Sequence, residues 1–94
     1  MEMQKIDHID AFADAIDTDL LLLGGTQEER KRFESAIIGI AYRFGMEPSV
    51  CYDRDKVISI FAEDMGLDDA IEWFEFNVIG AWMGESTPVF IEVL

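Results

Sequence analysis

Apolar residues recur every three or four positions along most of the chain, the spacing that places them on one face of an α-helix. A first helix is predicted over residues 6–20, with Gly24 and Gly25 as its stop signal. A second is predicted to begin after Thr26, which forms a capping-box pattern with Glu29, and to end at Gly45. The apolar stripe of this second helix consists of Phe33, Ile37, Ile40 and Phe44.

Two more helices are predicted in the second half of the chain. We expect Asp53 to cap a third helix that Gly66 closes, and Asp68 to cap a fourth that Gly84 ends. The third helix has one apolar face, whereas the fourth is apolar nearly all round. A helix of that kind is either central in the fold or shared with a partner.

Two short segments have the alternation of extended strands, residues 49–52 and 88–94. We expect residues 49–52 to pair with 89–93. Two strands alone are marginally stable, so they need helices packed against them. The predicted fold class is therefore mainly α (α+β). It is a single domain over residues 1–94, a four-helix small domain with a minimal two-stranded β pairing.

The chain is strongly acidic, with 20 Asp and Glu against 7 Lys and Arg and a formal net charge of −13. That balance argues against direct binding to nucleic acid or an anionic membrane, because such binding needs Lys and Arg. We expect partners with a basic protein surface instead. No stretch approaches the roughly 18 to 20 apolar residues of a membrane span. The single cysteine, Cys51, cannot form an internal disulfide, which fits a reducing cytoplasm.

The sharpest charge pattern lies on the first predicted helix. Asp7, Asp10, Asp14 and Asp17 are spaced three, four and three, so they share one face with a charge about every 5 Å of helix axis. A DNA strand carries one charge per about 3.4 Å. Two interpretations stay open, imitation of a phosphate backbone or an ordinary solvated helix face. The fourth predicted helix carries a second acidic stripe, made of Asp68, Glu72 and Glu75.

Other candidate chemistry is weaker. His8 lies between acidic residues without the companions of a metal site, and Cys51 without a partner His favours a buried structural thiol. No carboxylate pair stands out in the apolar setting that a catalytic acid needs. We therefore predict a non-enzymatic protein with no cofactor and no metal. Three aromatic residues of the fourth helix cannot all face one small core and are candidates for an oligomer interface, namely Trp73, Phe76 and Trp82.

The C-terminal half also carries a family resemblance. Its residues are Tyr52-Asp53 with Lys56-Val57, Met65-Gly66-Leu67, the run FEFNVIGAWMGE from Phe74, and Thr87-Pro88-Val89-Phe90. Over about residues 36–91 the chain resembles small proteins of no assigned activity that phages and prophages encode. The resemblance supplies no catalytic residue. It implies an accessory protein in the cytoplasm of an infected bacterial cell, and many small acidic phage proteins inhibit host defence, including restriction and CRISPR systems.

Three hypotheses follow for the function. The first is an inhibitor that binds the basic surface of a host nucleic-acid-binding or defence protein by nucleic-acid mimicry. The alternative is a homodimeric structural or assembly protein, joined through the fourth helix and the tail strand, with no inhibitory role. The third is a small enzyme or ligand binder, for which only Asp53, Glu72 and Asn77 offer polar candidates.

Overall fold

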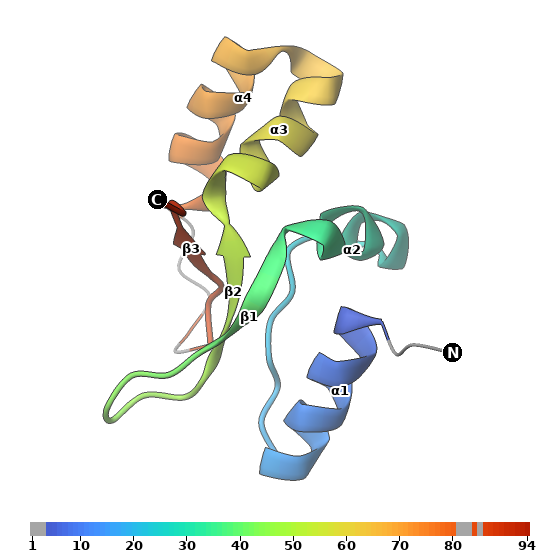
Figure 1. Ribbon diagram of the computed structural model, residues 1–94, viewed down its shortest axis with the longest axis vertical. Coiled ribbons are helices and arrows are strands. Elements are labelled where there is room, and N and C mark those ends of the chain that lie inside the picture. The colour runs from blue at the N-terminus through green and yellow to red at the C-terminus, as the bar shows by residue number, and fades with distance from the viewer. Residues whose placement is uncertain (1–3, 81–83, 85) are drawn as a thin grey trace.

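The computed structural model describes residues 4–80, 84 and 86–94 and contains helices at both ends of a small sheet (Figure 1). The described helices are α1 (Lys5–Ile16), α2 (Gln27–Phe33), α3 (Arg54–Met65) and α4 (Leu67–Trp73). The strands are β1 (Ile37–Ala41), β2 (Ser49–Asp53) and β3 (Val89–Ile91). A 3-10 turn, η1 (Glu34–Ala36), joins α2 to β1, and a π-helical turn, η2 (Phe74–Val78), extends α4.

The sheet has β2 at its centre, antiparallel to β1 and parallel to β3. Tyr52 lies opposite Phe90 in the parallel pair, so the predicted pairing between the two short segments is confirmed. The small α+β class is confirmed as well. The prediction of only two strands was wrong, because β1 adds a third.

The second predicted helix is the largest correction. It ends at Phe33 rather than near Gly45, and residues 37–41 pair with β2 instead. Phe33 and Ile37 are both buried, as the apolar stripe required, but the intervening backbone leaves the helix. The run Ile37-Ile38-Gly39-Ile40 is rich in β-branched residues and contains a glycine, both of which disfavour a helix. Gly45 has a φ of 76° in the loop between the strands, where a glycine meets no strain.

The first helix also stops early, at Ile16 rather than residue 20. Asp17 ends it in a left-handed conformation with φ 55°, and its backbone N–H points to the carbonyls of Ala13 and Asp14. Residues 20–23 then cross the core without regular secondary structure, and Leu20, Leu22 and Leu23 pack against it. The Leu23 N–H donates to the Tyr52 hydroxyl at 2.9 Å, which fixes this crossing segment to the central strand.

Two of the three predicted helix caps are confirmed. The Thr26 hydroxyl accepts from the Glu29 N–H at 3.1 Å, and Asp53 Oδ1 accepts from the N–H groups of the first turn of α3. The prediction of Asp68 as a cap was wrong, since α4 begins at Leu67 directly after Gly66. A φ of 85° at Gly66 lets the two helices join through that one residue. The prediction that the fourth helix continues to Gly84 was wrong, because the helical turns end at Val78 and residues 79–80 form a turn; residues 81–83 lie outside the described residues.

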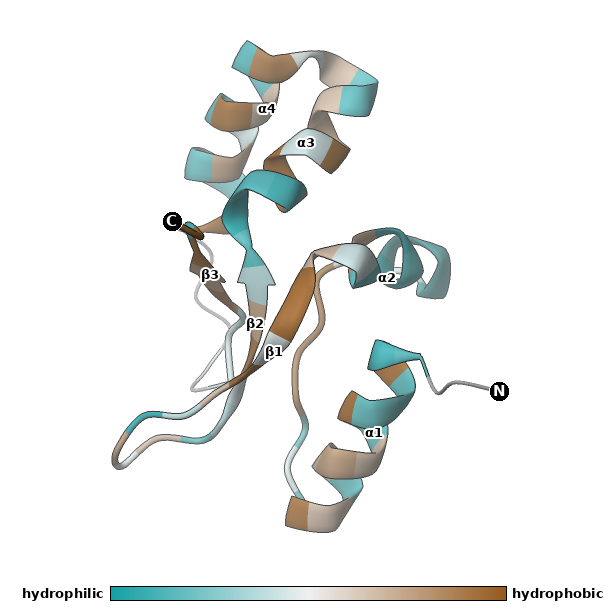
Figure 2. Cartoon of the chain, in the orientation of Figure 1, coloured by the Kyte–Doolittle hydropathy of each residue, from teal (hydrophilic) through white to brown (hydrophobic). Residues whose placement is uncertain are grey.

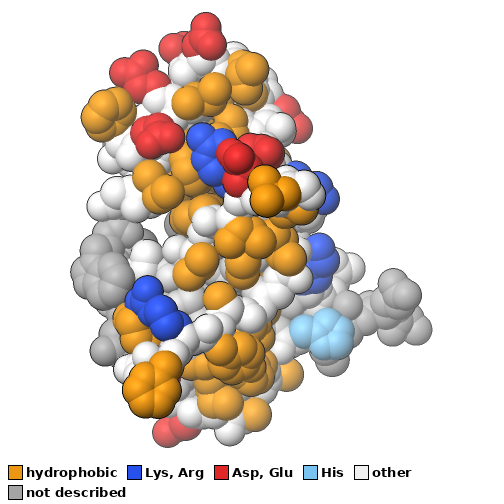
Figure 3. All heavy atoms as spheres, turned by 60° about the vertical axis from the view of Figure 1, so that its left-hand side comes forward, with side chains coloured by type: hydrophobic (Ala, Val, Ile, Leu, Met, Phe, Trp, Pro, Cys, Tyr) orange, Lys and Arg blue, Asp and Glu red, His pale blue; other side chains and the backbone are white. Residues whose placement is uncertain are grey.

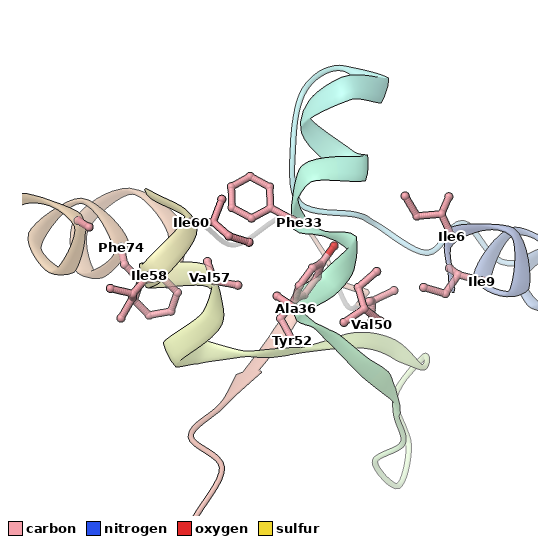
Figure 4. Packing of buried hydrophobic residues seen from close by; sticks show 12 residues of the cluster. Ile6, Ile9, Phe33, Ala36, Val50, Tyr52, Val57, Ile58, Ile60 and Phe74 are labelled. Atoms are coloured by element: carbon pink, nitrogen blue, oxygen red, sulfur yellow. The ribbon is translucent and has the colours of Figure 1, made fainter. Parts of the chain in front are cut away.

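The core lies on one side of the sheet (Figure 4). Val50, Tyr52, Val57 and Phe74 are fully buried there. The Phe90 ring stacks on Tyr52 with centroids 5.7 Å apart and meets Phe74 edge-on at 5.1 Å, so β3 and α4 are joined to the central strand through aromatic contacts. Figure 2 shows that α2 is mostly hydrophilic and that the neighbouring β1 is mostly hydrophobic. The chain therefore passes from the surface into the core between these two elements.

Candidate functional site

The acidic surface of α1 lies on the solvent-exposed part of the helix, beside the side that enters the core. Ile6 and Ile9 are buried, whereas Asp7, Asp10 and Asp14 are exposed. These three carboxylates span seven helical positions, about 10 Å along the axis. Asp17 is also exposed but follows the helix in its left-handed C-terminal turn. The four residues, Asp7, Asp10, Asp14 and Asp17, are called the α1 acidic face below.

Within residues 4–80, 84 and 86–94, no cation is seen to neutralise this surface. Among the described residues, every ion pair of the structure involves either Arg32 or Arg54, and none reaches the α1 acidic face. The one lysine of α1, Lys5, donates through its Nζ to the Ile37 carbonyl of β1 at 2.8 Å instead. The carboxylates of α1 therefore face solvent with their charge uncompensated by the pairs described.

The second acidic stripe is divided by the structure. Asp68 and Glu72 are exposed on α4, but Glu75 lies in η2 and pairs with Arg54 at 3.5 Å. The turn is π-helical there, with the Ile79 N–H bonded to the Phe74 carbonyl at 2.9 Å. A π turn rotates the helix face relative to regular α geometry. Asp68 and Glu72 are thus left as the exposed carboxylates of this stripe without a described ion pair.

The two acidic surfaces are separate. Figure 1 places α1 and α4 at opposite ends of the longest dimension of the molecule, which measures 39 Å. A single flat partner surface therefore cannot contact both of them at once. Each is a distinct candidate for partner binding, and the α1 acidic face is the one with more unpaired carboxylates.

Arg32 links two helices of the fold. Its guanidinium bonds to Asp64 at 2.7 Å, to Glu63 at 3.2 Å and to the Ile60 carbonyl at 3.0 Å, which links α2 to α3. The hydrogen bond from Arg32 lowers the pKa of Asp64 below its usual range, and its carboxylate partners raise the pKa of Arg32.

Arg54 has a similar role at the start of α3. Its guanidinium pairs with Asp55, Glu75 and Glu92 at 3.1, 3.5 and 3.6 Å and lies 5.6 Å from the centroid of the Phe74 ring. It therefore joins α3 to η2 and to the residues after β3 through charge and cation–π contact. Arg32 and Arg54 therefore both make links between elements of the fold.

Two of the three predicted interface aromatics are exposed. The side chains of Trp73 and Phe76 are 46% and 76% exposed, and Trp82 lies outside the described residues. A shallow hollow of about 510 Å³ runs beside them. Its lining consists of Met65, Asp69, Glu72, Trp73, Phe76 and Asn77. Trp73 and Phe76 therefore lie at the surface rather than in the core, as an interface would need.

The sheet has a second face that the sequence analysis missed. Strand register places Ile40, Val50, Tyr52 and Phe90 on the core side. The opposite side, called the outer sheet face below, carries Gly39, Ala41, Ser49, Cys51, Asp53, Val89 and Ile91. The alternation along residues 88–94 already indicated a strand with two faces. Because residues 37–41 were predicted to be helical, the surface that the three strands form together was not predicted.

The remaining candidates are His8, Cys51 and the three polar residues named for ligand chemistry. His8 is exposed on α1, and Cys51 is a buried free thiol whose pKa is raised by burial, as the prediction of a structural thiol required. Of the polar candidates for ligand chemistry, Glu72 and Asn77 line the same hollow, whereas Asp53 does not line it and caps α3. Within the described ranges, no group of three or more His, Cys, Asp or Glu could hold a metal ion. In the same ranges no helix has the length and apolar character needed to cross a membrane.

Comparisons of the chain with models of protein families, with curated proteins and with solved structures found no match in any of the three. The fold is that of a small α+β domain with acidic helices at both ends and exposed apolar side chains between them.

Proposed function

We propose that this protein binds another protein through the α1 acidic face, as a small accessory protein of phage type that occupies the nucleic-acid site of a host protein. Such a host protein would be a nucleic-acid-binding or defence protein, for example of a restriction or CRISPR system, in the bacterial cytoplasm. The single observation that carries the proposal is the set of exposed carboxylates on α1 that no described cation neutralises.

Charge spacing supports mimicry of a phosphate backbone. Asp7, Asp10 and Asp14 place three charges within about 10 Å of a rigid helix axis, and a DNA strand places three within about 7 Å. A nucleic-acid site built from Lys and Arg would gain charge-assisted hydrogen bonds from these carboxylates. The helix is held by Ile6 and Ile9 in the core, so the spacing is fixed before binding. The role needs no catalytic group, metal or cofactor.

The test is capture of bacterial proteins on the immobilised chain, followed by elution with rising salt and, in parallel, with duplex DNA. A partner held by the α1 acidic face elutes at moderate salt, because screening weakens contacts between exposed charges. It is also displaced by DNA that competes for the same site. Capture that resists both salt and DNA would contradict mimicry.

Two matched triple variants identify the surface. Asp7→Asn, Asp10→Asn and Asp14→Asn remove three charges from α1, while Asp68→Asn, Asp69→Asn and Glu72→Gln remove three from α4. All six positions are exposed, so both variants should fold. We expect only the α1 variant to lose the partner, by at least about tenfold in affinity. Equal losses would mean that net charge, rather than the α1 acidic face, drives binding.

A second candidate function is a homodimeric structural or assembly protein without an inhibitory role. The observation that favours it is the exposure of Trp73 and Phe76, since aromatic residues dominate the energetics of protein interfaces. Phe76→Glu would then dissociate an assembly that the unchanged chain forms at the same concentration. A chain that stays monomeric at millimolar concentration excludes this candidate.

A further inference from the structure

We propose that the hollow between α1 and β1 binds a medium-chain aliphatic carboxylate, with the alkyl chain inside the hollow and the carboxylate at Lys5. The inference goes beyond partner binding by the α1 acidic face and does not rest on it. Of the four hollows described on the surface, this is the one whose lining combines basic with apolar side chains and contains no carboxylate.

The hollow has the size and lining of a small-molecule site. Its volume is about 400 Å³, and ligand sites in proteins span roughly 300 to 1,000 Å³. One wall is α1, through Lys5, His8 and Ile9, and the other is residues 37–40 of β1 with Tyr42. Figure 4 shows Ile9 directed from α1 toward the sheet, where its side chain is buried. Mostly apolar walls with a few polar groups are typical of sites that hold a small ligand.

Two contacts join α1 to the strand at the two ends of the hollow. The Lys5 Nζ donates to the Ile37 carbonyl at 2.8 Å, and the Phe12 ring meets the Tyr42 ring edge-on with centroids 6.3 Å apart. Lys5 and Phe12 are seven positions apart, which is about 10 Å along the helix axis. An extended chain of eight carbons, at about 1.2 Å per bond, spans about 9 Å. Octanoate therefore fits lengthwise between the ammonium and the aromatic pair.

The Lys5 ammonium identifies the charged end of the ligand. After its bond to Ile37 it has two further N–H donors. In the described part of the chain no carboxylate pairs with it, since the ion pairs there belong to Arg32 and Arg54. The neighbouring Glu34 accepts from a backbone N–H of α1 at 2.9 Å instead. A ligand carboxylate would thus gain charge-assisted hydrogen bonds at a position fixed by the Lys5–Ile37 contact.

The carboxylates of the chain lie away from the hollow. Asp7, Asp10 and Asp14 are about 140° or more around the helix axis from Lys5. Figure 3 shows hydrophobic side chains over the lower half of the molecule and most of the visible acidic side chains at its upper end. Exposed charges farther away than about 8 Å are largely screened at physiological salt. The local ammonium therefore decides the sign of the interaction, despite the net charge of −13.

An extended peptide is a poorer occupant of this hollow. A peptide strand binds beside an edge strand by continuing its hydrogen-bond ladder. The ladder of β1 is irregular here, because the register shifts between Ile37 and Gly39 and the Lys5 ammonium occupies the Ile37 carbonyl. An alkyl chain needs no ladder, since it binds through apolar contact alone.

The experiment is an NMR titration of the ¹⁵N-labelled full chain with sodium octanoate at constant ionic strength. We expect saturable shifts at the amides of residues 38–40 and of α1, with a Kd of roughly 0.1 to 1 mM. Each buried methylene tightens binding about three- to fourfold, so butanoate should bind at least tenfold more weakly. Octan-1-ol has the same chain without the charge and should bind at least threefold more weakly. The absence of saturable shifts up to about 5 mM, or equal affinity for octanol and octanoate, overturns the proposal. Tighter binding of an acetylated tetrapeptide with an apolar C-terminal residue would also overturn it, in favour of a peptide.

A matched pair of lysine variants tests the charged end. Lys5→Met removes the ammonium, while Lys56→Met removes an exposed charge of α3 that does not line the hollow. We expect Lys5→Met to weaken octanoate at least threefold and to leave octanol within about twofold, a difference that damage to the fold would not produce. Lys56→Met should leave both affinities unchanged. Equal losses in the two variants would mean that net charge, rather than Lys5, holds the ligand, and would overturn the assignment.

A second pair leaves the Lys5 contact in place. Ile38→Asp adds a carboxylate to the wall of the hollow and Ile71→Asp adds one to α4, and the native side chains are 49% and 38% exposed. Both variants should keep the circular dichroism spectrum of the unchanged chain. We expect only Ile38→Asp to weaken octanoate, by at least fivefold. Octanoate affinity that survives both Lys5→Met and Ile38→Asp places the ligand elsewhere and overturns the proposal.

Discussion

Removal of one hydroxyl group tests how the crossing segment of residues 20–23 is held. Tyr52→Phe keeps the fully buried ring and its stacking on Phe90 but removes the oxygen that accepts from the Leu23 N–H at 2.9 Å. A buried donor left without a partner costs about 1 to 3 kcal/mol. Leu23 is only half-buried, so water reaches part of the freed group and we expect a loss of about 1 kcal/mol.

The assay is thermal unfolding together with hydrogen exchange of the Leu23 amide. A loss of 1 kcal/mol lowers the Tm of a domain of this size by roughly 4 to 8 °C. Tyr42→Phe is the matched control, because Tyr42 is exposed and its hydroxyl has no hydrogen bond among the described residues; its Tm should change by no more than a degree or two. Equal Tm values for the two variants, with unchanged protection at Leu23, would refute the reasoning.

Three further changes test the local geometry. Gly24→Ala should destabilise the fold by about 1 to 3 kcal/mol in a urea titration, because φ at Gly24 is 117° and a Cβ there would lie 2.9 Å from the Arg30 backbone nitrogen. Gly39→Ala is the control and should be nearly neutral, since a Cβ at Gly39 meets nothing within 4 Å. Asp53→Ala should cost about 1 kcal/mol through loss of the α3 cap, seen as a lower unfolding midpoint, and an unchanged midpoint would contradict that role. Burial raises the Cys51 pKa in the folded chain, so the unfolded thiol ionises first and stability should fall as pH rises above about 8.5. Cys51→Ala should flatten that decline between pH 8 and 10, and an equal slope in both chains would show that the thiol is not its source.

Local signals in the sequence predicted much of the fold because they depend on neighbouring residues. Thr26 with Glu29 and Asp53 before an apolar run each satisfy backbone N–H groups within one turn, so their effect is independent of the rest of the chain. The pairing of residues 49–52 with the tail was also predictable, since few other segments have the alternation of a strand.

The error at β1 has a tertiary cause. Phe33, Ile37 and Ile40 fit a helical period, and the same residues are placed toward the core when the chain changes from helix to strand after Ala36. Periodicity alone does not separate the two solutions; pairing with β2 decides between them. For the same reason the α1 acidic face was predictable from spacing within one helix, whereas the outer sheet face needs three strands from distant parts of the chain.

The parallel pairing of β3 has a consequence for the order in which the molecule opens. Tyr52 and its neighbour Phe90 are 38 positions apart, whereas the β1–β2 and α3–α4 contacts close over short loops. A strand of three residues held by one such distant pairing belongs to the least protected units of a fold, those whose amides exchange with solvent before global unfolding. We therefore expect the amides of β3 to exchange with solvent before those of the β1–β2 pair, which shows that the sheet opens from its C-terminal edge.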